Sequence, residues 1–584
     1  MRISLIIKAV LVLVFCGPLM AADTDSTAGG KALRQEQRLQ ELVAEFFEWR
    51  RIQQSVTGDH IPRMERPAGW LPDWSPAALA DYRLRQREFL DAVESLDTTG
   101  WSVSLQVDAR LLKAAVQRAY WELEVLQAPR RDPLFYLQQT LGSVFELLTL
   151  AKPIDAARAQ QIVARLNHIP LTLKAAQKNL DRPVRPFAQA AIERLDGIEA
   201  RLEEMQAGLL PHIPDERQQD LDRSVRKAVA ALESYRDWLE SRLEGMQTAF
   251  AIGPRAYQWF LVEVALLPYT PDELLARGDE AWQRAVAWGA VEKNRNRDLP
   301  PATPLPSVQR QIQVAALHEN ELRAFLESQN LMTVPDGLQH YLMRPLPEYL
   351  APLSFMGVAS DLGSETRLDE NAYRYLRKAA SDPPCSPPFA ACDPRPLIIH
   401  EGVPGHYFQL ARSWANPNPL RRRYIDSSAN EGIAFYMEEL LLQAGLFDYS
   451  PRAREIIFGE MRLQALRLAV DIRLAVGELS IEQAADHLAR GGPMDRDRAL
   501  QEAVFIASNP GRAISQQAGK LQILRFLAAA GLDRGEGFSL RHFHDFLMEN
   551  GNLPIALQRW EYLGRNDEIM RLDALGGKPV TVPR

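Results

Sequence analysis

The chain has 584 residues, of which 46% are hydrophobic and 24% are charged. This balance excludes a disordered chain, a collagen-like chain and a protein with many membrane spans. Lys and Arg number 68 against 75 Asp and Glu, which gives a formal net charge of −7. Such a mildly acidic chain has no nucleic-acid footprint. The short basic run at 421–423 is therefore interpreted as a solvated helix end.

The N-terminus resembles an export signal. A basic end precedes an apolar stretch over Leu5–Phe15, and small residues follow at Ala21 and Ala22. This pattern is typical of a secretory signal peptide over residues 1–22, and it predicts a periplasmic or secreted protein. The alternative is a lipoprotein attached through Cys16, which is less favoured because a bulky residue precedes that cysteine. No stable membrane span is expected, since no other segment is long and apolar enough.

Apolar residues recur at three- and four-residue intervals through most of the chain, which is the helical period. Clean two-residue alternation is scarce, so strands are expected to be minor. The sequence predicts an all-α, mostly helical fold, with prolines such as Pro170 separating the helices. The expected helices are 31–54, 105–127, 134–150, 155–180, 185–208, 216–249, 397–415, 429–446, 451–476, 480–490, 498–507, 515–530, 539–550 and 553–563.

Two proline-rich stretches interrupt the helical pattern. The first, at 299–306, predicts a boundary between an N-terminal helical region (23–300) and a C-terminal catalytic region (301–584), although the two could form one continuous body. The second, at 381–396, contains Cys385 and Cys392. In an oxidising compartment these cysteines are expected to close a small disulfide loop, with two free thiols as the alternative.

Candidate metal-binding and catalytic side chains are most concentrated in the segment His400-Glu401-Gly402-Val403-Pro404-Gly405-His406. It begins like the zincin helix, in which two His residues four apart bind zinc and the adjacent Glu is the base. Here His400 and His406 are six apart, about 600° around a regular helix, so both rings could not reach one ion. Pro404 and Gly405 can break the helix, because proline removes a backbone donor and glycine permits unusual backbone angles. We therefore expect a distorted insertion that brings His406 back to the metal.

Zinc needs a third protein ligand and an open position for water. Glu431 supplies a carboxylate from the first turn of the next helix, whose start carries a Ser/Asn cap signal. Glu438, seven residues later, lies on the same face and is the rival ligand or an orienting partner. The expected set is zinc on His400, His406 and Glu431, with Glu401 as the base that activates water.

An ordered set of motifs resembles the bacterial family labelled domain of unknown function 885. It comprises His-Glu-x-x-Pro-Gly-His-x-x-Gln at 400–409, Glu-Gly-Ile-Ala-Phe-Tyr-Met-Glu at 431–438, Asn-Pro-Gly-Arg-Ala at 509–513, Gly519, Phe-His-Asp at 543–545 and Gly-Asn-Leu-Pro at 551–554. The resemblance covers about residues 340–565. It implies a mostly α-helical, zincin-like hydrolase with a deep cleft and the same zinc ligands and base.

Two positions depart from the family pattern. Family members commonly carry a Tyr followed by Lys where this chain has Gln516 and Gln517, and a His where it has Ala475. That Tyr is a natural stabiliser of an oxyanion, and losing such a donor costs about 10²–10³ in rate. Arg512, Gln516 or His544 are the candidates to replace it. The candidate catalytic residues are therefore Glu401, Arg512 and His544.

The sequence thus predicts an exported zinc metallopeptidase that acts on peptides. One alternative is a non-catalytic, metal-stabilised helical binding protein, which the two departures favour. Another is a zinc hydrolase of non-peptide amides or esters, which would use the same site. The sequence leaves the oligomeric state open.

Overall fold

The computed structural model describes residues 28–57, 64–377 and 391–577. Helices hold 70% of the structure and strands 3%, which confirms the mostly helical fold. In this part of the chain, no helix combines the length and apolar character that a membrane crossing requires. Cys392 is disulfide-bonded, whereas Cys385 lies outside the described residues. The predicted signal peptide and Cys16 also lie outside them.

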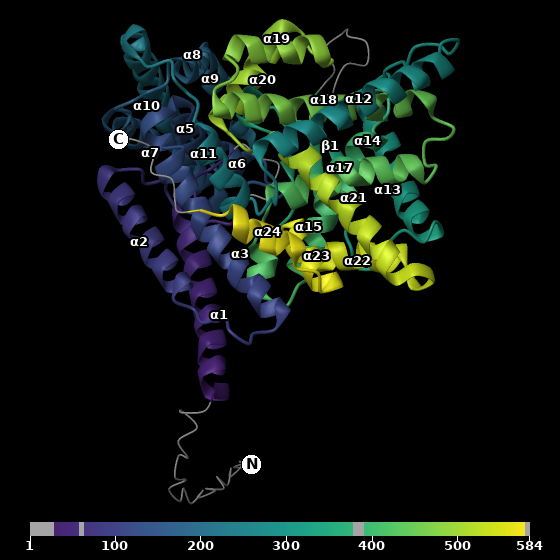
Figure 1. Cartoon of the computed structure of the whole chain (residues 1–584). Coiled ribbons are helices and arrows are strands. Elements are labelled where there is room, and N and C mark those ends of the chain that lie inside the picture. The colour runs from purple at the N-terminus through teal and green to yellow at the C-terminus, as the bar shows by residue number, and fades with distance from the viewer. Residues whose placement is uncertain (1–27, 58–63, 378–390, 578–584) are drawn as a thin grey trace, which may run out of the picture.

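The first half of the chain is a succession of helices (Figure 1). They are α1 (Ala28–Gln53), α2 (Pro76–Glu94), α3 (Val103–Tyr120), η2 (Trp121–Val125), α4 (Ala128–Arg131), α5 (Pro133–Leu137), η3 (Gln138–Gly142), α6 (Ser143–Leu148), α7 (Ala156–Asn179), α8 (Arg185–Leu195), α9 (Ile198–Leu209), η4 (Leu210–His212), α10 (Asp215–Glu240), η5 (Leu243–Gly245), α11 (Pro254–Trp259), η6 (Phe260–Val264), α12 (Pro271–Arg295) and α13 (Val308–Ser328).

A small sheet separates these helices from those of the second half. The sheet and the later helices are β1 (Tyr341–Pro345), η7 (Ala351–Met356), β2 (Ser360–Asp361), β3 (Ala372–Leu376), α14 (Arg395–Leu397), η9 (Ile398–Gly402), α15 (His406–Trp414), α16 (Pro419–Arg423), α17 (Ser427–Gln443), α18 (Pro451–Val476), α19 (Ile481–Gly491), α20 (Arg496–Ser508), α21 (Ser515–Arg534), η10 (Gly535–Gly537), α22 (Leu540–Glu549), α23 (Ile555–Leu563) and α24 (Asp567–Leu575).

Most predicted helices lie within a few residues of their expected bounds, because their apolar periodicity is strong. Two expectations about where helices are interrupted were wrong. Pro170 lies inside α7, which continues through it because buried residues on either side pack into the core. The helix expected over 185–208 is instead two helices, since Gly197 adopts a left-handed conformation (φ +64°) between α8 and α9.

The largest hydrophobic core joins the two ends of the chain. It contains residues of α1 to α10 together with Leu420, Leu557 and Leu572, which belong to α16, α23 and α24. Figure 1 shows α23 and α24, in yellow, beside α3. The last helices therefore share a core with the first ones. A second core surrounds the sheet, η9, α15, α17, α21 and α22.

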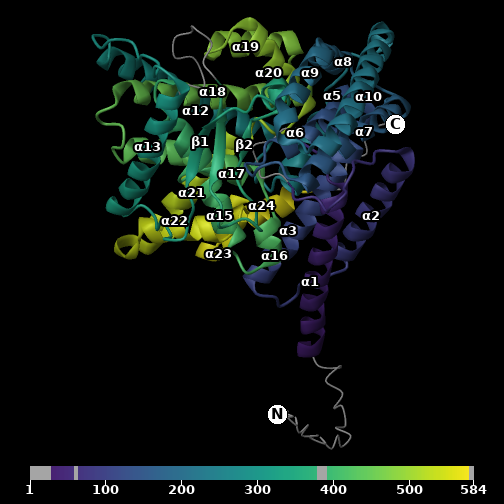
Figure 2. The same ribbon diagram turned by 180° about the vertical axis from the view of Figure 1, so that it is seen from behind.

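The three strands form one sheet in the order β1-β3-β2. Figure 2 labels β1 and β2. β1 pairs with β3 in parallel, with Tyr341 opposite Ala372, and β2 pairs with β3 antiparallel. The Tyr341 ring packs directly against Gly402 of η9. A Cβ atom added at Gly402 would lie only 2.5 Å from a carbon of that ring. The sheet thus supplies one wall of the region that holds the His-Glu motif.

Helices α17 and α21 cross closely at the centre of the second core. A Cβ atom at Gly432 would lie 2.5 Å from Cα of Gly519, and one at Gly519 would lie 1.9 Å from the backbone oxygen of Ser428. Only glycine fits at such a crossing. Most residues of α17 are buried, as in an enclosed helix. Its N-cap is Asp426, which accepts from the Ala429 amide at 2.8 Å, rather than the predicted Ser or Asn.

Arg421 contradicts the interpretation of its basic run as a solvated helix end. It is 6% exposed, and its guanidinium donates to Asp108 of α3 at 2.8 Å and to both carboxylate oxygens of Glu561 on α23 at 2.7 and 3.0 Å. The next two residues, Arg422 and Arg423, do lie nearer the surface, beside Glu365. No local pattern in the sequence predicts these distant acids. Arg421 therefore ties α16 to both ends of the chain.

Replacing Arg421 by Met is expected to lower the free energy of unfolding by about 3–5 kcal/mol, because it leaves two buried carboxylates without their cation. Urea titration followed by circular dichroism measures this change. Arg423→Met serves as the control, since its pairing to Glu365 is exposed and such pairs contribute about 0–1 kcal/mol. Equal stability of both variants would show that the buried network contributes nothing.

Candidate metal centre

The chain breaks its helix between the two histidines of the motif. η9 ends at Gly402, Val403 is extended (φ −118°, ψ 119°), and α15 begins at His406. The structure therefore shows the break expected from the six-residue spacing. Gly405 is needed for space: a Cβ there would lie 1.9 Å from the backbone oxygen of His400. The chain folds back on η9 at this point, so α15 starts beside His400.

Changing Gly405 to Ala is expected to displace α15 from η9 and to weaken any metal bound by the two histidines at least about tenfold, because the new Cβ meets backbone atoms that cannot move away. Isothermal titration with zinc measures the affinity. Gly531→Ala is the matched control. It lies in α21 with open space around it, and there alanine should stabilise the helix by up to about 1 kcal/mol. Wild-type affinity in the Gly405 variant would contradict the close approach.

The break brings three side chains together. Within the described residues, one ligand atom each from His400, His406 and Glu431 lies within 4.8 Å of the others. Nε2 of His400 and Nε2 of His406 are 3.4 and 3.6 Å from the same carboxylate oxygen, Oε2 of Glu431. The two rings lie edge to face, with centroids 4.8 Å apart. Two imidazole nitrogens and a carboxylate oxygen thus converge on one point.

His406 indicates what this arrangement can hold. It is 1% exposed, and neither of its ring nitrogens has a hydrogen-bond partner in the described parts of the chain. A buried polar atom without a partner is costly, so its presence calls for a ligand. Two His nitrogens and one carboxylate oxygen are a ligand set that zinc prefers, and three protein ligands are typical of a catalytic site. The three residues therefore fit a zinc ion.

The second nitrogen of His400 is fixed by Glu438. Nδ1 of His400 lies 2.6 Å from Oε1 of Glu438, so Nε2 points towards Glu431. A carboxylate that orients a ligating histidine in this way is a recurrent feature of metal sites. Burial would lower the pKa of His400, but hydrogen bonds to Glu431 and Glu438 outweigh it and raise the pKa well above its usual value. Glu438 therefore lies behind the histidine rather than among the convergent ligand atoms.

Glu431 lies in the first turns of α17 and faces both histidines. Burial would raise its pKa, but the neighbouring His406 and His400 outweigh that effect and hold the pKa well below its usual value. Gln516, from the start of α21, donates from Nε2 to the same Oε2 atom at 2.9 Å. The close crossing of α17 and α21 thus places an amide donor on the carboxylate ligand.

Two strand residues contact Glu401, and no sequence motif predicted either of them. Nη1 of Arg374 on β3 donates to Oε1 and Oε2 of Glu401 at 3.0 and 3.2 Å. The hydroxyl of Tyr341 on β1 donates to Oε2 at 2.8 Å. Burial, with Glu401 nearby, raises the pKa of Tyr341 well above its usual value, so the hydroxyl keeps its proton. Glu401 is therefore a buried carboxylate with fixed orientation, one residue from His400.

A model of the bacterial family described as a protein of unknown function, DUF885, matches residues 53–560. The chain belongs to the DUF885 family. The match covers more than half of the chain, including the region of the motif and the helices that precede it. No curated protein matches this DUF885 chain.

Two solved structures resemble the DUF885 chain along almost their whole length. A "putative lipoprotein of unknown function" from Shewanella oneidensis is 17% identical, with a TM-score of 0.67 over 91% of this chain and 99% of that one. A "putative lipoprotein" from Colwellia psychrerythraea is 17% identical, with a TM-score of 0.72 over 93% of this chain and 100% of that one. At this identity the likeness shows a shared fold.

The remaining predicted residues of this DUF885 chain make other contacts in the structure. His544 is fully buried, with Nε2 at 2.8 Å from the Tyr436 hydroxyl and Nδ1 at 2.7 Å from the Leu331 carbonyl oxygen. Burial lowers its pKa to about 4. Since both ring nitrogens are engaged in the core, His544 is not retained as a catalytic candidate. Ala475 packs in a core cluster with Tyr257.

Arg512 lies in the loop between α20 and α21. Its guanidinium lies over the Phe505 ring, 5.1 Å from the centroid, and burial lowers its pKa to about 9. Asp471 holds this loop by accepting from the amides of Gly511 and Ala513 at 2.8 and 2.7 Å. The loop is therefore rigidly positioned beside the start of α21.

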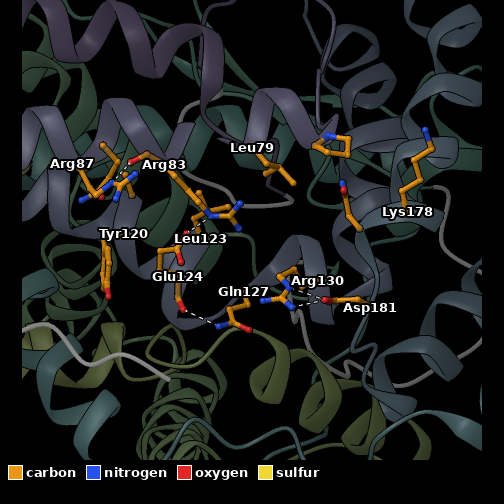
Figure 3. Close-up of a pocket in the computed structure, with 14 residues that line it drawn as sticks. Leu79, Arg83, Arg87, Tyr120, Leu123, Glu124, Gln127, Arg130, Lys178 and Asp181 are labelled. Carbon is orange, nitrogen blue, oxygen red and sulfur yellow. Dashed lines mark hydrogen bonds and ion pairs between the residues drawn. The ribbon is translucent and has the colours of Figure 1, made fainter. Parts of the chain in front are cut away.

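A separate cavity of about 730 Å³ lies on the N-terminal half of the DUF885 chain (Figure 3). Two ion pairs cross it: Nε of Arg83 lies 2.6 Å from Glu124, and Nε of Arg130 lies 2.9 Å from Asp181. No histidine or cysteine is among its lining residues. This cavity thus lacks the histidine and cysteine ligands that zinc sites commonly use. The metal centre is therefore the stronger candidate for catalysis.

Proposed function

We propose that this DUF885 protein is an exported zinc-dependent hydrolase, and specifically a metallopeptidase. The observation that carries the proposal is the convergence of His400, His406 and Glu431 next to Glu401. In this arrangement His400, His406 and Glu431 would hold the ion. When bound there, zinc supplies an acidified water molecule and an electrophilic position for a substrate carbonyl.

Glu401 is the group that moves the proton. Its carboxylate accepts a proton from the attacking water and later passes that proton to the leaving amine. Arg374 and Tyr341 support this role, because charge-assisted and hydroxyl hydrogen bonds hold the carboxylate in one orientation. Glu438 holds His400 in the orientation that ligation needs.

A second candidate function is a non-catalytic, metal-stabilised binding protein. It is favoured by Gln516, which stands where the family commonly has Tyr and which donates to Glu431 instead of facing a substrate. A zinc hydrolase of non-peptide amides or esters would use the same residues and remains an alternative substrate class.

Export is the second part of the proposal. Residues 1–22 have the pattern of a cleaved signal peptide, and the two structural relatives are described as lipoproteins. Mass spectrometry of the mature protein distinguishes the two forms of export. Cleavage near Ala21 or Ala22 gives a periplasmic or secreted protein, whereas a lipid on Cys16 gives the anchored form. An uncleaved Met1 terminus would contradict both.

The catalytic proposal is tested on the purified protein with and without metal. Elemental analysis should find about one zinc per chain. A mixed peptide library, followed by mass spectrometry, should show cleavage that a chelator abolishes and added zinc restores. Zinc-loaded protein that cleaves no peptide, amide or ester would favour the binding protein. Absence of bound metal after reconstitution would remove the metal centre itself.

A further inference from the structure

One face of the small sheet is directed towards the His-Glu motif. Tyr341 of β1 lies opposite Ala372 of β3, and Arg374 is two residues further along β3. Because successive side chains of a strand alternate between the two faces, Tyr341 and Arg374 share one face. The Tyr341 ring packs on Gly402, and its hydroxyl donates to Glu401. Arg374 therefore reaches Glu401 from the same face of the sheet.

The guanidinium of Arg374 lies at the open end of the Glu401 carboxylate. Nη1 is 3.0 Å from Oε1 and 3.2 Å from Oε2, so it is nearly equidistant from the two oxygens. Both oxygens that could accept a proton from the attacking water are thus within hydrogen-bond distance of the guanidinium. The positive charge therefore lies next to the atoms that move the proton.

Arg374 has donors left for a second acceptor. Its Nε and Nη2 donate to no protein acceptor in the described parts of the chain, and the side chain is 17% exposed. A guanidinium carries five N–H donors in a rigid plane, so it can hold two oxygen acceptors at once. Arg374 can therefore contact Glu401 and an oxygen atom of a substrate together.

Two candidates to replace the Tyr that family members commonly carry have other contacts. Gln516 donates to Glu431, and both ring nitrogens of His544 are engaged in the core. Amide hydrolysis places negative charge on the carbonyl oxygen, and one donor aimed at that charge is worth about 10²–10³ in rate. Arg374 is a cation that contacts the proposed base, so it is placed to supply such a donor.

We propose that Arg374 is a catalytic residue that stabilises the oxyanion formed on the substrate carbonyl. As water attacks, its proton passes to Glu401 and its oxygen forms a bond to the carbonyl carbon. The electron pair of the carbonyl π bond moves to the carbonyl oxygen, which becomes negatively charged. This inference rests on the proposed hydrolase function and adds a residue to the same site.

The charges around Arg374 change in the direction that catalysis needs. Glu401 loses its negative charge when it takes the proton, in the same step in which the carbonyl oxygen gains one. The guanidinium thus exchanges a carboxylate partner for the oxyanion and is never left without a counter-charge. Its contact with the carbonyl oxygen becomes charge-assisted only during the reaction, which is the condition for lowering the barrier.

Binding of a tetrahedral anion tests this assignment without turnover. The probes are two analogues of acetyl-tetraalanine amide whose central amide is replaced by a phosphinate or by a ketomethylene group, titrated calorimetrically with zinc-loaded protein. The wild type should bind the anionic phosphinate at least about 100-fold more tightly. Arg374→Gln should reduce this preference at least about tenfold, because a charge-assisted hydrogen bond is lost, while zinc content stays unchanged.

Two comparisons separate this role from a structural one. Arg344→Gln is the matched control and should keep the preference, since Arg344 is an exposed residue of β1 that lies over the Tyr373 ring. In a Glu401→Gln background, Arg374→Gln should still weaken phosphinate binding at least about tenfold. No further loss in that background would show that Arg374 acts only through Glu401, which overturns the inference. A wild type that binds both analogues equally, or binds neither, overturns it as well.

Hydrolysis of the peptides that the library identifies gives the second arm. Arg374→Gln should lower kcat by about 10²–10³-fold and leave KM little changed. A rise in KM alone would assign Arg374 to ground-state binding and overturn the inference, while the peptidase function stays intact. Phosphinate binding that depends on Arg374, without hydrolysis of any peptide, would support the assignment and overturn the peptidase function instead.

Discussion

Replacing Glu401 by Gln is expected to lower peptide hydrolysis by about 10²–10⁴-fold, because the amide cannot accept the proton of the attacking water. The substitution conserves shape, so the Tyr341 hydroxyl can still donate to the side-chain oxygen. Zinc content should stay at the wild-type level, since Glu401 is not among the three convergent ligands. Initial rates and elemental analysis on the same preparation measure both quantities.

The control for this variant is Glu536→Gln, which makes the same chemical change at an exposed position in η10. It should keep wild-type activity. A Glu401 variant with undiminished hydrolysis and full zinc occupancy would exclude Glu401 as the base. Loss of zinc together with activity would instead show that Glu401 supports the ligands, and the assignment of the proton step would then be open to another carboxylate.

Replacing Glu431 by Gln is expected to weaken zinc binding by more than about 100-fold, because the site loses its only carboxylate ligand and the negative charge that balances the ion. Zinc should raise the melting temperature of the wild-type protein, since a ligand that binds only the folded state stabilises it. That rise should disappear in the variant. Competition titration and thermal unfolding with and without zinc measure the two effects.

Glu438→Gln provides a graded comparison for this prediction. Glu438 contacts His400 rather than the point where the ligand atoms meet, so its loss should cost about 10–100-fold in affinity. The order of affinity should therefore be wild type, then the Glu438 variant, then the Glu431 variant. If the Glu438 variant binds zinc more weakly than the Glu431 variant, the two carboxylates have exchanged roles.

Much of the helical architecture could be predicted because apolar periodicity reports burial along each helix. α18, for example, begins and ends where the pattern does. What failed depended on tertiary packing. Pro170 does not end α7, since the surrounding core holds the helix together, and Arg421 is buried because acids more than a hundred residues away converge on it. A linear pattern carries no information about such partners.

The candidate site could be predicted only where its residues are neighbours in sequence. The six-residue spacing of His400 and His406 required a helix break, and the structure shows one. Arg374 and Tyr341, in contrast, reach Glu401 from a small sheet whose strands had no clear alternation. The contact of Gln516 with Glu431 depends on the crossing of two helices. Residues of this kind are found from contacts rather than from motifs.

The central claim is that one metal ion binds between His400, His406 and Glu431. Anomalous X-ray diffraction at the zinc absorption edge, from crystals of the zinc-reconstituted protein, tests it most directly. A single strong peak should lie about 2.0–2.2 Å from a nitrogen of each histidine and an oxygen of Glu431. Crystals grown with zinc that show no peak among these three side chains, or show the ion bound only elsewhere, would contradict the account.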